Sequence, residues 1–151
     1  MAASSEELEA HLRAYQEALS SYDAKRAAEL WGVPGTIVSD AFVGSLDSRE
    51  AMAAGLEQSY PIYQRLGLHH VEHQTLDRVD LTDRLLRVHV RWLFYDADGE
   101  LLTDGHYEYL LRRDDEGLRT YVAVAIDERE KLTQLAQRQG IDLGELASPL
   151  G

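Results

Sequence analysis

The spacing of apolar residues changes once along the chain, at Leu68, and this change limits the folds open to the sequence. Before Leu68, apolar residues recur at steps of three and four, which is the period of a helix lying on a core. After Leu68 they recur at every second position, which is the period of a strand with one buried face. The turn sequences "DADG" and "DDEG" divide this second part into long consecutive strands. The sequence therefore predicts an α+β fold, with N-terminal helices packed on an antiparallel meander.

Three helices are expected before Leu68. The first, "SSEELEAHLRAYQEALSSY", begins with Ser4 and Glu7 at the spacing of a capping box. A short second helix is expected over "DAKRAAELW", with Asp23 as its N-cap. The third covers "LDSREAMAAGLEQSYPIYQRLG", with Asp47 at its start, and Pro61 should kink or split it.

A short strand is expected between the second and third helices, over "GTIVSDAFVG". In an extended chain Asp40 shares a face with Val38 and Phe42. A carboxylate on a largely apolar face is either a working group with a raised pKa or a polar residue satisfied near the rim. The residues themselves leave both interpretations open.

Length and composition exclude several classes of protein. The 151 residues suit one domain, expected over 1–151 with a core at about 5–139 and a tail at 140–151. A net charge of −12 disfavours nucleic acids and anionic membranes as partners. The chain has no cysteine, so disulfides and thiolate chemistry are excluded. No apolar run has the length of a membrane helix, and a cytoplasmic location is expected.

Charge complementarity predicts the register of the "DADG" hairpin. The expected pairs are Arg91 with Asp104, Arg87 with Glu108, and His89 with His106. The opposite face then carries Trp92 and Tyr107 toward the helices. On the last strand the residues expected on this inner face are Thr120, Val122, Val124 and Ile126.

The outer face of the meander is expected to mix apolar and charged side chains. Its apolar members would be Leu85, Leu93, Leu110, Tyr121, Ala123 and Ala125. This composition is too apolar for a wide face in water and too charged for a core, and is typical of an interface. We therefore expect a homodimer formed through the outer sheet face.

The element order and two stretches resemble the nuclear transport factor 2-like superfamily, and most closely its uncharacterised bacterial members. The stretches are "AYQEALSSYDAKRAAELW" followed by "TIVSD", and "VRWLFYDADGELLTDGHYEYLLRR". The resemblance covers about residues 8–126. It implies a cone in which three N-terminal helices pack on a strongly curved antiparallel sheet. The superfamily includes ketosteroid isomerases and small polyketide cyclases, and these stretches are signatures of the fold rather than of a reaction.

The isomerase branch of the superfamily implies roles for individual residues. Tyr15 stands where that branch has an oxyanion-binding tyrosine, and Asp40 stands where it has the catalytic base. The second oxyanion donor of the isomerases, an aspartic acid, falls in "GHYEYLL", which supplies Tyr107 or Tyr109 and no acid. The resemblance thus implies a cofactor-independent isomerase or cyclase, with one of its donors altered.

The function we expect is the binding of a small molecule without a known reaction; the isomerase or cyclase is the alternative, and whether the chain is an enzyme stays open. A cavity for a small hydrophobic or planar ligand is expected, lined by Trp31, His73, Trp92, Tyr107 and Tyr109. The same side chains would serve equally well as core residues. No cofactor is implied by any motif.

The histidines of "HHVEH" do not form a metal site by their spacing. In a strand, His69 and His73 lie about 13 Å apart and His70 faces the other way. A zinc ion needs its ligands within about 2 Å of one point. No metal is therefore expected.

Overall fold

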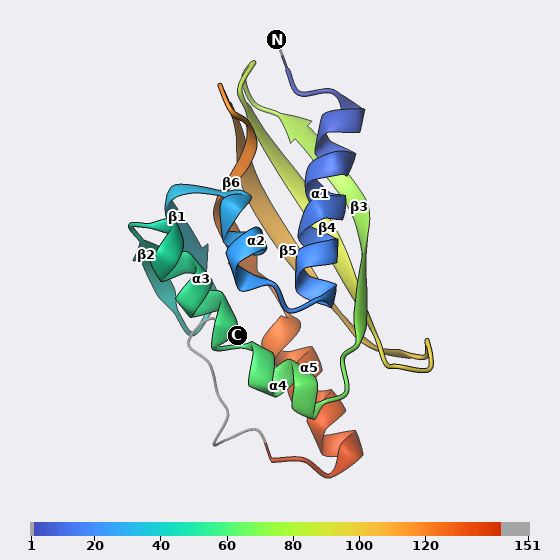
Figure 1. Cartoon of the computed structure of the whole chain (residues 1–151). Helices are drawn as coiled ribbons and strands as arrows, with labels where there is room; N and C mark the ends of the chain where they lie inside the picture. The colour runs from blue at the N-terminus through green and yellow to red at the C-terminus, as the bar shows by residue number, and fades with distance from the viewer. Residues whose placement is uncertain (1, 143–151) are drawn as a thin grey trace.

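The computed structural model describes residues 2–142 and contains helices on one side of a six-stranded sheet (Figure 1). The helices are α1 (Ser5–Ser20), α2 (Ala24–Glu29), α3 (Arg49–Glu57), α4 (Tyr60–Arg65) and α5 (Glu128–Gln139). The strands are β1 (Trp31–Val38), β2 (Val43–Leu46), β3 (His70–Asp80), β4 (Leu85–Tyr95), β5 (Leu101–Asp114) and β6 (Gly117–Ala125). Most of the expected tail lies outside the described residues.

The helix ends follow the sequence signals with two differences. The capping box at Ser4 and Glu7 is present, and Asp23 caps α2 by accepting from the Arg26 amide. The prediction of Asp47 as the start of the third helix is wrong, because the neighbouring Ser48 caps α3. Pro61 lies in the first turn of a separate helix, α4, so four helices precede β3 instead of three.

Strands β3 to β6 form the predicted antiparallel meander, and the α+β class is confirmed. The sheet order is β2-β1-β6-β5-β4-β3, and β1 pairs parallel with β6, a mixed pairing that the sequence did not suggest. Figure 1 shows α1 lying along the sheet, α2 beside α1, α3 on the other side of α2, and α4 and α5 together at one end. The core lies between these helices and the inner face of the sheet, where Trp92 is 2% exposed, as predicted.

The predicted register of the β4–β5 hairpin is wrong by two residues. Arg91 lies opposite His106, and Trp92 lies opposite Gly105. The prediction assumed a two-residue loop, whereas Asp96 pairs with Glu100 across a three-residue loop and a bulge follows at Tyr95. A shift of two keeps every side chain on its expected face. The expected ion pairs still form, now as diagonal neighbours.

The predicted faces of the last strand are wrong beyond Tyr121. Tyr121 is the extra residue of a β-bulge, because Leu110 pairs with Val122 and Leu111 pairs with Thr120. One extra residue reverses the alternation that follows it. Ala123 and Ala125 therefore lie opposite Tyr109 and Tyr107 on the inner face. Val122 and Val124 lie on the outer face.

Candidate functional site

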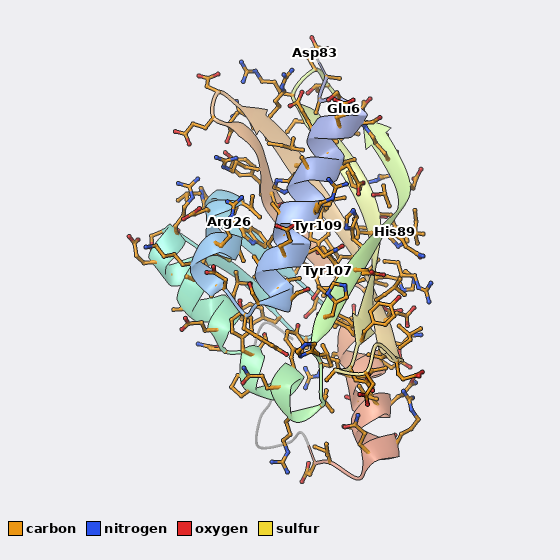
Figure 2. The ribbon with its side chains drawn as sticks, turned by 45° about the vertical axis from the view of Figure 1, so that its right-hand side comes forward. Glu6, Arg26, Asp83, His89, Tyr107 and Tyr109 are labelled. Atoms are coloured by element: carbon orange, nitrogen blue, oxygen red, sulfur yellow. The ribbon has the colours of Figure 1, made fainter. Side chains whose placement is uncertain are left out.

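A cavity of about 70 Å³ lies between the inner face of the sheet and the helices. It is bordered mainly by aromatic side chains from α1, α4, β1, β4 and β5. Five of the seven predicted site residues lie around it: Tyr15, Trp31, Trp92, Tyr107 and Tyr109. Figure 2 shows Tyr107 and Tyr109 in the space between α1 and the sheet. The apolar stripe of α1 and the alternation of β4 and β5 point these side chains at one another.

Two indole–phenol hydrogen bonds order this aromatic wall. Trp31 donates from Nε1 to the Tyr15 hydroxyl at 3.2 Å, and Trp92 donates from Nε1 to the Tyr109 hydroxyl at 2.7 Å. The Tyr15 and Trp92 rings lie 6.0 Å apart and tie the two pairs together. Burial raises the pKa of Tyr15 to about 12 and raises that of Tyr109 well above its usual range. Both phenols therefore keep their protons at neutral pH.

Glu128, the first residue of α5, is a carboxylic acid inside the same cavity and is 3% exposed. Its Oε1 accepts from the Tyr63 hydroxyl at 2.7 Å, and its Oε2 accepts from the Tyr107 hydroxyl. Burial raises the pKa of Glu128, and the hydrogen bonds from the two tyrosines oppose this effect. The site thus holds one buried carboxyl group between two phenols.

Glu128 reaches this position because the start of α5 packs closely against β5. A Cβ on Gly105 would lie 3.3 Å from the Glu128 Cβ, so the glycine permits the close approach. Asp127, which precedes Glu128, accepts from the His106 amide at 2.7 Å and lies 2.9 Å from His106 Nδ1. Asp127 makes no side-chain cap to its own helix. Its carboxylate instead anchors the start of α5 to the sheet.

Sequence reasoning missed both Glu128 and Tyr63. The "DERE" sequence at the start of α5 looks like the usual preference for acids in the first turn of a helix. Nothing local marks one of these acids as buried. Tyr63 lay in the segment after Pro61, where the direction of the helix could not be predicted.

Asp40 lies outside this cavity. Ser39 and Phe42 exchange backbone hydrogen bonds, which leaves Asp40 and Ala41 at the exposed tip of a turn between β1 and β2. The prediction of Asp40 within a strand is therefore wrong, because β1 ends at Val38. Asp40 borders a separate groove beside α5. The structure does not bring Asp40 and Tyr15 together.

His73 lies between α1 and the sheet, behind the cavity wall. Its ring lies 6.0 Å from that of Trp92, and its side chain is 7% exposed. Nδ1 lies 2.6 Å from Gln16 Oε1, and Nε2 lies 2.7 Å from Glu9 Oε1. Both ring nitrogens thus lie within hydrogen-bond distance of side chains of α1. His73 supports Trp92 from behind instead of bordering the cavity.

Residues 2–142 contain no group of three His, Asp or Glu side chains placed to hold a metal ion. None of the helices in this part of the chain has the length and apolar character needed to cross a membrane.

The helices, the curved sheet and the cavity between them define an α+β cone of the nuclear transport factor 2-like kind. The family model described as NTF2-like protein (DUF6841) matches residues 5–128, and the chain belongs to this family. The resemblance inferred from the sequence is therefore confirmed. Comparison with curated proteins gives no match.

Solved structures show the same fold at low sequence identity. A domain of unknown function with a cystatin-like fold from Nostoc punctiforme is 15% identical, with a TM-score of 0.66 over 93% of this chain and 90% of that one. An NTF-2-like protein of unknown function from Shewanella oneidensis is 14% identical, with a TM-score of 0.64 over 81% and 98%. A ketosteroid isomerase-like protein from Erwinia carotovora atroseptica is 13% identical, with a TM-score of 0.60 over 80% and 93%. At these identities the likeness extends to the fold alone.

Proposed function

We propose that the protein binds a small, mostly apolar ring compound in the cavity between the helices and the sheet. The observation that carries this proposal is the aromatic lining combined with polar groups deep in the core. Interiors are normally packed without such space, and an aromatic cavity with a few convergent polar groups is typical of a ligand site. The cavity volume of about 70 Å³ is several times the volume that a single buried water molecule needs.

A thermal-shift screen of small ring compounds tests this proposal, because a ligand that binds only the folded state raises its melting temperature. The matched control is Ala123→Leu. Ala123 borders the cavity and carries no polar group, so leucine would fill the space and leave the tyrosines and Glu128 in place. We expect hits with the native chain that disappear in Ala123→Leu. Equal shifts for both proteins would contradict binding in this cavity.

The second candidate function is proton transfer, and the buried Glu128 favours it. Asp40 lies outside the cavity, so among residues 2–142 Glu128 is the carboxyl group that a ligand in the cavity would meet. Its carboxylate would take a proton from the carbon beside a carbonyl, leaving the electron pair of the C–H bond in an enolate. The raised pKa of Glu128 brings its basicity closer to what such a step needs.

Isotope exchange tests this candidate directly. In D₂O, a catalytic Glu128 would speed deuterium uptake at C2 of 1-indanone, as followed by proton NMR. Glu128→Gln would reduce the rate to the uncatalysed level, while Asp40→Asn would leave it unchanged. Exchange that is equally fast without Glu128 excludes it as the base and leaves binding as the function.

We also propose that the protein forms a homodimer through the outer face of its sheet. Val43 is 70% exposed there, and Val124 and Leu110 continue the apolar surface. Acidic and basic side chains of β4 and β5 flank these residues, so the face can pair with a copy of itself. Sedimentation of the native chain and of Val124→Asp tests this, and a native monomer at high concentration would contradict it. The cytoplasmic location stays a prediction.

A further inference from the structure

We infer that the ligand of the cavity carries a carbonyl or similar oxygen that accepts hydrogen bonds from tyrosine hydroxyls, Tyr60 above all. The inference rests on the proposed binding function and names the chemical class of the ligand. It also rests on tyrosine hydroxyls at the cavity whose protons have no acceptor among residues 2–142.

Tyr60, the first residue of α4, supplies the donor with no partner. Its side chain borders the cavity and is 8% exposed, and its hydroxyl has no hydrogen-bond partner among residues 2–142. The ring packs edge-on against Tyr22, with centroids 5.1 Å apart, which limits its movement. An unpaired buried hydroxyl destabilises the folded chain. A ligand acceptor at this point would remove that destabilisation.

Tyr15 and Tyr109 add two further donors. Each hydroxyl accepts from an indole, so its oxygen is engaged while its own proton has no acceptor in the described part of the chain. Tyr15 is close enough to both Tyr60 and Tyr109 to raise their pKa values, in each case after the larger effect of burial. All three tyrosines border the same cavity.

Among residues 2–142, the one carboxyl group that borders the cavity already has a hydrogen-bond donor at each oxygen. Each carboxyl oxygen of Glu128 accepts a tyrosine hydroxyl, from Tyr63 and from Tyr107. Tyr22 donates to the Leu68 carbonyl at 2.5 Å and is satisfied as well. The hydroxyl protons of Tyr15, Tyr60 and Tyr109 therefore remain available to a ligand. A site with unused donors favours a ligand with an acceptor over a shape-matched ligand without one, because the latter leaves the donors buried and unpaired.

The test compares 1-indanone with indane, which share one bicyclic skeleton and differ by the ketone oxygen. Dissociation constants are measured by tryptophan fluorescence, since Trp31 and Trp92 border the cavity. We expect the native chain to prefer 1-indanone by about 10-fold or more. Tyr60→Phe should lose most of this preference by weakening 1-indanone binding, with indane binding unchanged. Tyr121→Phe, the same substitution outside the cavity, should keep the preference.

The outcomes separate the two proposals. Binding of both compounds with equal affinity overturns the acceptor inference and leaves the cavity as an apolar binding site. A preference that survives in both Tyr60→Phe and Tyr15→Phe also overturns it, because the tyrosines would then not be the donors. Binding of neither compound overturns the proposed function, and the inference falls with it.

Discussion

His11 should make the fold sensitive to acid, because it is buried in its neutral form. It lies on α1, is 6% exposed, and hydrogen-bonds through Nε2 to the Thr120 hydroxyl of β6 at 3.0 Å. Burial lowers the pKa of His11 from 6.5 to about 4, and the nearby Arg119 cation acts in the same direction. Protonation would place an uncompensated charge between helix and sheet.

The sign and size of the change in unfolding free energy with pH follow from proton binding to His11 in the folded and unfolded states. Below pH 6.5 the unfolded chain is protonated at His11, whereas the folded chain becomes protonated there only at about pH 4. This contribution to stability is complete above pH 6.5 and is lost as the pH falls toward 4. The loss amounts to about 2 kcal/mol at pH 5 and about 3 kcal/mol at pH 4. Net stabilities of about 5–15 kcal/mol are typical of small domains, so the effect is measurable.

Urea unfolding followed by circular dichroism provides the assay, at pH 7, 6 and 5, for the native chain and for His11→Gln. Glutamine keeps a hydrogen-bonding group but does not titrate. Between pH 7 and 5 the native chain should lose about 2 kcal/mol relative to the variant. Taking the difference removes the contributions of the carboxyl groups, including Glu128, which both proteins share. A difference that stays constant with pH would refute the reasoning, provided the m-values agree.

Substitutions at three further positions test the fold around the cavity by urea unfolding at pH 7. Trp92→Ala should cost about 3–5 kcal/mol, because it removes a buried indole and its bond to Tyr109, and a cost under about 1 kcal/mol would contradict its placement. Tyr60→Phe should raise stability by about 1–3 kcal/mol, since it removes an unpaired buried hydroxyl; a loss would indicate a hidden partner. Asp127→Ala should cost about 1–3 kcal/mol by breaking the contacts with His106, and Asp127→Asn should recover part of it; equal costs for both would mean that these bonds do not anchor α5.

The helices and the meander were predictable because long periodic segments and capping residues carry their own signals. The register of the β4–β5 hairpin was harder to predict, because it depends on a three-residue loop and a bulge, and charge pairs do not indicate either of these. Arg91 Nε lies 2.7 Å from Asp104 Oδ2 although the two residues are not directly opposite. Long side chains reach diagonal partners as easily as direct ones. Charge complementarity therefore fixed the face of each residue but not its partner.

The candidate site was predictable on its aromatic side and not on its acidic side. Tyr15, Trp92 and Tyr109 lie on clear apolar faces, so their convergence follows from alternation. Glu128 is buried where Gly105 permits the close approach of α5 and where Asp127 accepts from the His106 amide, and both contacts join segments far apart in sequence. Asp40 was misplaced for a local reason, because the backbone turns at Ser39 while the composition still resembles a strand.

Because of the bulge at Tyr121, the residues that limit the width of the cavity lie on a different element of the fold from the residues that supply its polar groups. Because the bulge turns Ala123 inward, opposite Tyr109, the wall facing the tyrosines is built from methyl groups, where an unbroken strand would have presented the isopropyl groups of Val122 and Val124. Under the proposed function, the size of the compound admitted would therefore be limited on β6, whereas the hydroxyls that would recognise its oxygen lie on α1, α4 and β5. A substitution at Ala123 would then change the size of ligand that fits without altering any of these tyrosine hydroxyls.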